Sequence, residues 1–113
     1  MTHLKINYVE FATKDIGATK GFLAKAFGWT FVDYGPEYQA FDNAGIDGGV
    51  YQYPDAALKA PLVVLKADDL EAAEAAIKAA GGEIVQAIFP FPGGRRFHFR
   101  EPGGNELAVW SEK

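Results

Sequence analysis

The chain has 113 residues, which suffices for one compact domain, so we expect a single domain and not a multidomain enzyme. Hydrophobic residues make up 49% and charged residues 23%, a composition typical of a globular protein and not of a disordered chain. The net charge of −4 argues against nucleic acid as a partner. The chain contains no cysteine, which excludes disulfides and thiolate zinc sites and is compatible with a reducing compartment. Because no apolar segment is long enough for a membrane span or a signal peptide, we expect a soluble cytoplasmic domain with no membrane partner.

The first half of the chain predicts a strand, a helix and three further strands. Residues 6–13 are rich in β-branched and aromatic side chains, which favours a strand. Asp15 stands at a helix N-cap position, and apolar residues then recur every three to four positions as far as Gly28. Three short strands are expected over residues 30–34, 38–41 and 48–53.

The second half predicts the same order again after a segment bounded by prolines. Residues 62–66 form the expected strand, and Asp68 with Glu71 three positions later is typical of a capping box. Apolar residues then recur at helical spacing until Gly81 ends the pattern. Three further strands are expected over residues 83–88, 95–100 and 106–110. The pairs Gly48-Gly49, Gly93-Gly94 and Gly103-Gly104 are interpreted as turns, since none precedes a helix that could bind phosphate.

The two halves are related by an internal repeat. Asp15 and Asp69 are 54 positions apart, whereas Val50 and Ala108 are 58 apart. A half of this size cannot cover its own sheet, so we expect the two to combine in an α+β fold of paired βαβββ modules, with eight strands forming a cup and two outer helices. The predicted organisation is one domain over 1–113, with module one at about 4–53, a linker at about 54–61 and module two at about 62–111.

Several segments carry a family resemblance: YVEFATKD followed by GFLAKAFGW, DDLEAA with AAGG, and RFHFREPGGNEL. Together they resemble the vicinal oxygen chelate superfamily, which holds glyoxalase I, extradiol dioxygenases, fosfomycin-modifying enzymes and bleomycin-binding proteins. The resemblance spans nearly the whole chain and implies the same paired βαβββ modules. It also implies a homodimer, because members commonly pair modules or pack whole chains side by side.

The resemblance further implies where a divalent metal would be held, on the first and last strands of each module. Those positions correspond to Tyr8, Val50, Leu62 and Ala108. Divalent ions require carboxylate or imidazole donors, which none of these residues supplies. We therefore expect neither the usual metal site nor any other cofactor.

Strand alternation indicates which side chains face the cup. The candidate ligand-binding residues are Tyr8, Glu10, Gln52, His98 and Trp110. Their neighbours of opposite orientation are expected to pack beneath the helices; they are Val9, Phe11, Val63, Leu65, Phe97, Phe99, Leu107 and Val109.

Each candidate has a plain structural alternative. Glu10 is interpreted as a base or a group that holds an amine, or else as a rim carboxylate paired with an arginine such as Arg100. His98 is an acid, base or stacking ring, or simply a hydrogen-bonded histidine. Tyr8 and Trp110 form an aromatic wall for a planar ligand, or merely fill the cup.

The leading functional hypothesis is a metal-free protein that binds a small, planar or aromatic molecule. The first alternative is a metal-free enzyme that uses Glu10 and His98 for proton transfer. The second is a metal-dependent lyase or isomerase with the unusual ligand set Glu10, Gln52 and His98. The sequence leaves open whether any bound molecule is converted.

Overall fold

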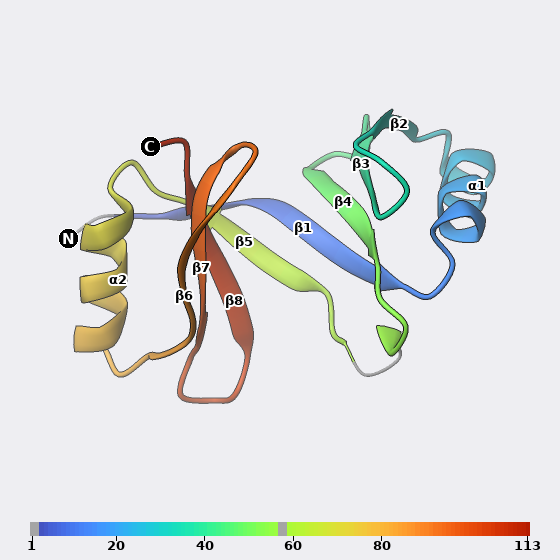
Figure 1. The fold of residues 1–113 in the computed structure, drawn as a ribbon. Helices are drawn as coiled ribbons and strands as arrows, with labels where there is room; N and C mark the ends of the chain where they lie inside the picture. Colours follow the sequence, from blue (N-terminus) through green and yellow to red (C-terminus); the bar gives the residue numbers. More distant parts are fainter. Residues whose placement is uncertain (1–2, 57–58) are drawn as a thin grey trace. The chain divides into compact units, whose positions relative to one another are not determined.

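The computed structural model describes residues 3–56 and 59–113 (Figure 1). Within these residues the chain forms eight strands and two helices, which confirms the predicted α+β class and the repeated βαβββ order. The elements are β1 (Lys5–Thr13), α1 (Ile16–Phe27), β2 (Thr30–Asp33), β3 (Tyr38–Asp42), β4 (Asp47–Gln52), β5 (Leu62–Lys66), α2 (Leu70–Ala79), β6 (Glu83–Phe91), β7 (Gly94–Arg100) and β8 (Glu106–Ser111). Neither of these helices is long and apolar enough to cross a membrane.

The chain divides into two compact units. The N-terminal unit comprises residues 8–62, and the C-terminal unit comprises residues 1–7 together with 63–113. The start of the chain belongs with the second half for two reasons. Leu4 packs against the core of the C-terminal unit, and Asn7 accepts a hydrogen bond from the indole of Trp110 at 3.2 Å.

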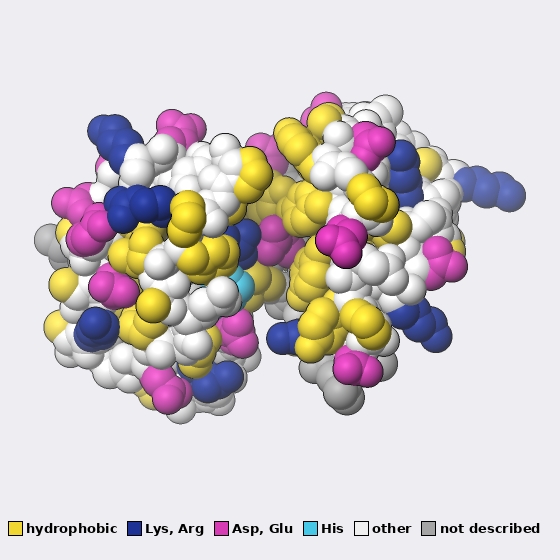
Figure 2. All heavy atoms as spheres, viewed as in Figure 1, with side chains coloured by type: hydrophobic (Ala, Val, Ile, Leu, Met, Phe, Trp, Pro, Cys, Tyr) yellow, Lys and Arg dark blue, Asp and Glu magenta, His cyan; other side chains and the backbone are white. Residues whose placement is uncertain are grey.

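In the N-terminal unit the strand order is β2-β3-β4-β1, with β1 and β4 parallel and the other pairs antiparallel. The Asp15 side chain caps α1 by accepting from the amide of Ala18 at 3.0 Å, and Gly28 ends the helix at φ 74°. No residue of α1 is buried, and hydrophobic side chains lie at the surface of this unit (Figure 2). The largest of them are the exposed rings of Phe22, Phe27 and Tyr34.

Gly48 and Gly49 lie within β4, so their interpretation as a turn is wrong. A Cβ on Gly48 would lie 2.1 Å from the carbonyl oxygen of Val9 and against the ring of Phe41. A Cβ on Gly49 would lie 2.2 Å from the hydroxyl of Tyr38. The two glycines are therefore needed because strand β4 accommodates an aromatic ring of β3 on each of its faces.

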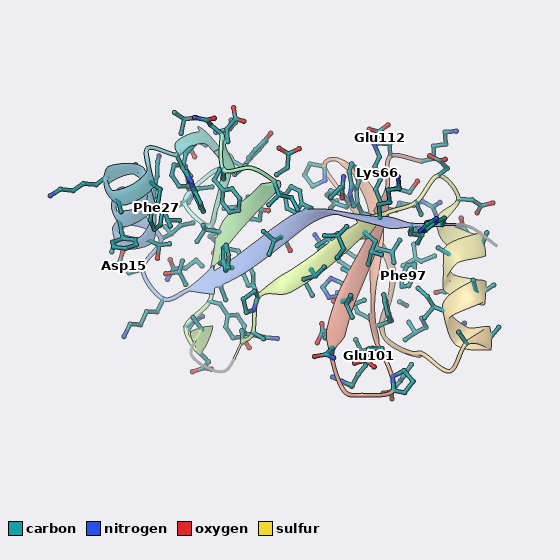
Figure 3. The ribbon with its side chains drawn as sticks, turned by 180° about the vertical axis from the view of Figure 1, so that it is seen from behind. Asp15, Phe27, Lys66, Phe97, Glu101 and Glu112 are labelled. Carbon is teal, nitrogen blue, oxygen red and sulfur yellow. The ribbon has the colours of Figure 1, made fainter. Side chains whose placement is uncertain are left out.

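In the C-terminal unit the strand order is β6-β7-β8-β5, with β5 and β8 parallel. One face packs against α2, and Phe97 lies between the sheet and this helix (Figure 3). The buried core comprises Ala67, Leu70, Ala73, Phe97, Phe99 and Val109, and Leu65 and Leu107 pack against it. These contacts confirm the predicted positions of Leu65, Phe97, Phe99, Leu107 and Val109, whereas Val63 is not part of this cluster.

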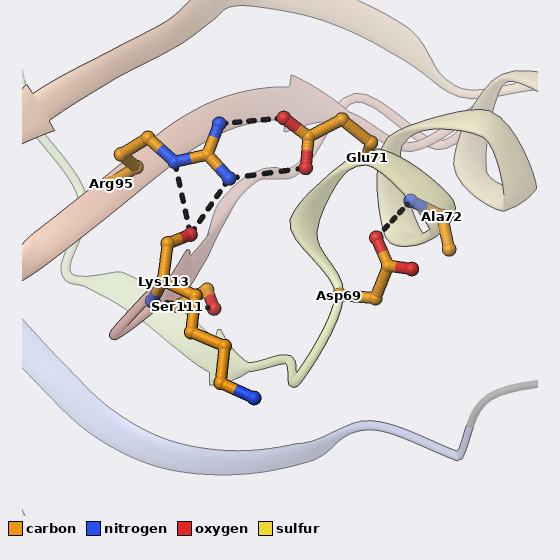
Figure 4. Close-up of polar contacts among 6 residues, drawn as sticks. All are labelled: Asp69, Glu71, Ala72, Arg95, Ser111 and Lys113. Atoms are coloured by element: carbon orange, nitrogen blue, oxygen red, sulfur yellow. Dashed lines mark hydrogen bonds and ion pairs between the residues drawn. The ribbon is translucent and has the colours of Figure 1, made fainter.

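The start of α2 differs from the predicted capping box (Figure 4). Asp69, and not Asp68, is the N-cap, and its side chain accepts from the amide of Ala72 at 3.0 Å. Glu71 does not close the box. Its two oxygens accept from the guanidinium of Arg95 at 2.6 and 3.1 Å, so an ion pair takes the place of the reciprocal cap.

The number of residues that separates equivalent positions of the two units increases by one between the third and the fourth strand of the unit. Strands β3 and β7 end 58 positions apart, at Asp42 and Arg100, but β4 and β8 begin 59 apart, at Asp47 and Glu106. A shift of one residue moves every side chain of a strand to the other face. The predicted equivalence of Val50 and Ala108 is therefore wrong, and Gly49 is the counterpart of Ala108.

Candidate functional site

A chain of three hydroxyl and carboxyl groups lies on the face of the N-terminal unit that α1 does not cover. The hydroxyl of Tyr38 donates to Oε2 of Glu10 at 2.8 Å, and the hydroxyls of Tyr8 and Tyr38 lie 2.7 Å apart. Tyr38 has one hydroxyl hydrogen, which Glu10 accepts, so Tyr8 is the donor in the second bond. Tyr8, Tyr38 and Glu10 thus form a relay, named here the tyrosine relay, that ends on a carboxylate.

The tyrosine relay is largely withdrawn from solvent. Glu10 is only 7% exposed, and Tyr8 and Tyr38 are half-buried. Burial, the nearby Glu10 carboxylate and the bond to Tyr8 raise the pKa of Tyr38 far above that of an ordinary phenol. Tyr38 therefore remains a hydrogen-bond donor at every physiological pH, and the absent side chain of Gly49 leaves room for its hydroxyl.

Gln52 does not lie beside Tyr8 and Glu10, so its predicted position is wrong. In the β1–β4 register Gln52 pairs with Thr13, and Glu10 pairs with Gly49, which places Gln52 and Glu10 on opposite faces. The Gln52 amide accepts from the backbone of Ile16 at 3.0 Å and donates to the carbonyl of Lys14 at 2.5 Å. Gln52 therefore holds the start of α1, and a metal-ligand set that combines it with Glu10 is not supported.

In the C-terminal unit, the face opposite α2 carries His98, whose Nδ1 lies 3.0 Å from Oε2 of Glu106. The guanidinium of Arg100 approaches the other oxygen of Glu106 at 4.0 Å and an oxygen of Glu83 at 3.4 Å. The ring of Phe89 lies 5.9 Å from the His98 ring. The bond to Glu106 is what the plain alternative of a hydrogen-bonded histidine expects, and together with the contact to Phe89 it positions the imidazole.

Trp110 lies on the same face of this unit as His98, because both alternate with core residues of their strands. Its indole nitrogen donates to Asn7, and the ammonium of Lys66 lies 4.9 Å from its ring centroid. The ring of Phe91 meets it at 6.1 Å in an edge-on arrangement. Trp110 thus has the surroundings of a ring that attracts cations and aromatic groups.

The positions at which the family would hold a divalent metal do not fit one. With the corrected register they are Tyr8, Gly49, Leu62 and Ala108, which present one phenol and otherwise no oxygen or nitrogen donor from a side chain. Across residues 3–56 and 59–113 there is also no group of three or more acidic, histidine or cysteine side chains with the geometry of a metal site.

Two side chains that bond to the candidate residues, Tyr38 and Glu106, were not predicted from the sequence. Tyr38 comes from β3, a strand with no candidate of its own, and reaches Glu10 diagonally across the glycines of β4. Glu106 is a diagonal neighbour of His98, because β7 pairs with β8 through His98–Ala108 and Arg100–Glu106. That register follows from a hairpin turn at residues 101–105 between the two predicted strands. The sequence therefore allowed the prediction that Glu106 lies beside His98.

A family model described as Glyoxalase/Bleomycin resistance protein/Dioxygenase superfamily matches residues 5–109. No curated protein sequence matches the chain significantly.

Solved structures have the same fold at low sequence identity. A Mn(II)-bound glyoxalase from Novosphingobium aromaticivorans has a TM-score of 0.70 at 24% identity, and the match covers 96% of this chain and 38% of that chain. Methylmalonyl-CoA epimerase from Mycobacterium tuberculosis has a TM-score of 0.71 at 13% identity, with 94% and 86% covered. An extradiol ring-cleaving dioxygenase from B. fuscum has a TM-score of 0.75 at 17% identity, with 97% and 33% covered. At these identities the likeness extends to the fold alone.

Proposed function

The chain belongs to the glyoxalase/bleomycin resistance protein/dioxygenase superfamily, and from that premise we propose that it binds a small organic molecule without a resident divalent metal. The observation that carries the proposal is the tyrosine relay, with the carboxylate of Glu10 only 7% exposed and held by a phenol. A buried carboxylate costs free energy unless it is compensated, and such groups are concentrated at functional sites.

The chemistry of the relay indicates the kind of group that it recognises. A carboxylate accepts as many as about four hydrogen bonds and donates none. The raised pKa of Tyr38 keeps its phenol neutral, so this phenol takes part in the relay as a hydrogen-bond donor. The ligand that fits is a compound with an amine, amide or other N–H group, and the neighbouring tyrosine rings favour an aromatic or planar body.

The proposal is tested by a thermal-shift screen of aromatic amines and amides, followed by titration of the hits. A ligand present at about a hundredfold over its dissociation constant adds roughly 2.7 kcal/mol of stability, which a melting curve detects. Glu10→Gln should weaken the hits about tenfold or more, because a charge-assisted hydrogen bond is lost. Tyr38→Phe should weaken them less, and Tyr34→Phe, at a tyrosine that is 67% exposed, is the matched control.

Two results would overturn the proposal. The first is a set of hits whose affinity is unchanged by both Glu10→Gln and Tyr38→Phe in variants that remain folded by circular dichroism. The second is a stoichiometric divalent metal in the purified protein that survives dialysis, measured by elemental analysis. A Trp110→Leu variant tests the aromatic face of the C-terminal unit by itself.

A metal-free enzyme is the second candidate, because His98 is hydrogen-bonded to a carboxylate as proton-transferring histidines often are. Incubation of each hit with the protein distinguishes the two functions. A chemically changed hit, with the change abolished by His98→Ala or Glu10→Gln, would assign an enzyme, whereas recovery of the unchanged compound supports binding alone.

The proposal includes a homodimer and a cytoplasmic location. The exposed fractions of Phe22, Phe27 and Tyr34 are 62%, 59% and 67%, and a second copy that covers part of this apolar surface would stabilise the N-terminal unit. Light scattering that gave only the mass of a single chain would contradict the dimer.

A further inference from the structure

We infer that His98 and Glu106 form a proton-accepting site for the O–H group of a planar weak acid, such as a phenol. All of the residues involved belong to the C-terminal unit. The inference therefore does not depend on the tyrosine relay, and it adds a second kind of ligand group to the N–H group proposed there.

The hydrogen bond between His98 and Glu106 determines where the imidazole can accept a proton. An ionised carboxylate only accepts hydrogen bonds, so at 3.0 Å the Nδ1 atom of His98 is the donor. In the neutral ring one nitrogen carries hydrogen and the other a lone pair, so Nε2 is the acceptor. The side chain of His98 is only 14% exposed, which limits the directions from which a proton donor can approach.

Glu106 is itself held in place across three strands. Its Oε2 atom accepts from His98, and its Oε1 atom lies 4.0 Å from the guanidinium of Arg100. The same guanidinium lies 3.4 Å from Glu83 on β6. Arg100 thus makes a long ion pair with the carboxylate, and the carboxylate, by its hydrogen bond, orients the imidazole. Glu106 is accordingly a positioning residue, and His98 is the group that would touch the ligand.

The surroundings of the imidazole favour an aromatic ligand. The ring of Phe89 lies 5.9 Å from that of His98 at an interplanar angle of 39°, so a planar molecule beside the imidazole would also meet an aromatic surface. When such a ligand transfers its proton, the ligand O–H bond breaks, its electron pair stays on the ligand oxygen, and an Nε2–H bond forms. The resulting imidazolium lies between the phenolate and the Glu106 carboxylate, which stabilise its charge.

The test uses 4-nitrophenol, because its phenolate absorbs visible light and the neutral phenol does not. At a pH just below the pKa of free 4-nitrophenol, addition of the protein should raise the phenolate absorbance to a saturating value. His98→Ala should abolish that increase. Glu106→Gln keeps a hydrogen-bond acceptor but removes the charge, so it should reduce the bound phenolate fraction roughly tenfold. Glu83→Gln, one step farther from the imidazole, is the matched control and should leave most of the increase.

Nitrogen chemical shifts of the two histidines provide a second measurement that a general loss of folding cannot imitate. In the unliganded protein, His98 should show the tautomer with hydrogen on Nδ1, whereas the exposed His3 serves as an internal reference. The inference would be overturned by hydrogen on Nε2 of neutral His98, or by a phenolate increase that persists in folded His98→Ala. The relay is tested with amines and amides and this site with 4-nitrophenol, so the two tests fail independently.

Discussion

The two units have the same strand order but carry different side chains on their sheets. In both, the first strand lies parallel to the last, and the remaining neighbours are antiparallel, in the orders β2-β3-β4-β1 and β6-β7-β8-β5. The position of Glu10, 54 residues before Val64, is acidic in one unit and apolar in the other. Both side chains are buried, at 7% and 1% exposure. Because the same backbone accepts valine at this position, the fold does not require the acid.

This difference supports a functional reading of Glu10. The C-terminal unit fills the position with a buried valine, whereas the N-terminal unit has a carboxylate there that accepts a hydrogen bond from a phenol. Sites that depart from the simplest packing solution are where function is expected. The same reasoning applies to Gly49, whose counterpart Ala108 carries the Cβ that Tyr38 excludes in the N-terminal unit.

The two helices also differ in how closely they pack against their sheets. Helix α2 buries Leu70 and Ala73 against its sheet, whereas no residue of α1 is buried. The C-terminal unit therefore has a compact helix-covered core, and the N-terminal unit relies more on its strands, where Phe41 and Val50 are buried. We therefore expect a substitution in the core of the C-terminal unit to cost more stability than one on α1 of the N-terminal unit.

The largest effect is expected from truncating the core of the C-terminal unit. Phe97 is 0% exposed, and Phe97→Ala should lower the free energy of unfolding by about 3–5 kcal/mol, because a large buried ring leaves a cavity. Phe22→Ala, at a ring that is 62% exposed on α1, should change it by roughly 0.5 kcal/mol or less. Urea titration measures both values. Equal costs for the two substitutions would contradict the contrast between the units.

A smaller effect is expected at Gly49. Gly49→Ala forces the hydroxyl of Tyr38 away from Glu10 and should cost about 1–3 kcal/mol through overpacking. Gly21→Ala is the control, since a Cβ there meets nothing within 4 Å and removes a helix-interior glycine, which should stabilise by roughly 1 kcal/mol.

A double-mutant cycle identifies the cause of the cost at Gly49. In a Tyr38→Ala background the clash has no partner, so Gly49→Ala should cost less by at least about 0.5 kcal/mol. An unchanged cost would show that the backbone, and not Tyr38, excludes a side chain at this position. A reduced cost would agree with Ala108, which occupies the equivalent position of the C-terminal unit with no tyrosine beside it.

The features of the fold that depend on local signals are predictable from the sequence. Helical periodicity, the N-cap Asp15 and the glycine stops predict both helices, and the repeat predicts both sheets. The prediction fails at β4 because the loop before that strand is one residue shorter than the loop before β8, which reverses the face of Gln52. It also misses Tyr38, because a bond from β3 to β1 across β4 depends on tertiary register. Tyr38 forms hydrogen bonds with two of the predicted candidates, Tyr8 and Glu10.

The smallest effect concerns the first turn of each helix, where Glu71 of α2 corresponds to Gly17 of α1. Hydrogen bonds from Arg95 hold the pKa of Glu71 below its ordinary value. A carboxyl whose pKa is lower in the folded state contributes stability above its unfolded pKa, about 4.3, and loses that contribution as the pH falls through the folded value. The melting temperature of the wild type should therefore decline more steeply below about pH 4.3 than that of Glu71→Gln. The ion pair is exposed, so the difference should be small and should shrink with added salt. Parallel curves for the wild type and Glu71→Gln at low salt would show that the Glu71–Arg95 ion pair contributes no measurable stability. The start of α2 would then be no more stable than that of α1, which has glycine at the equivalent position.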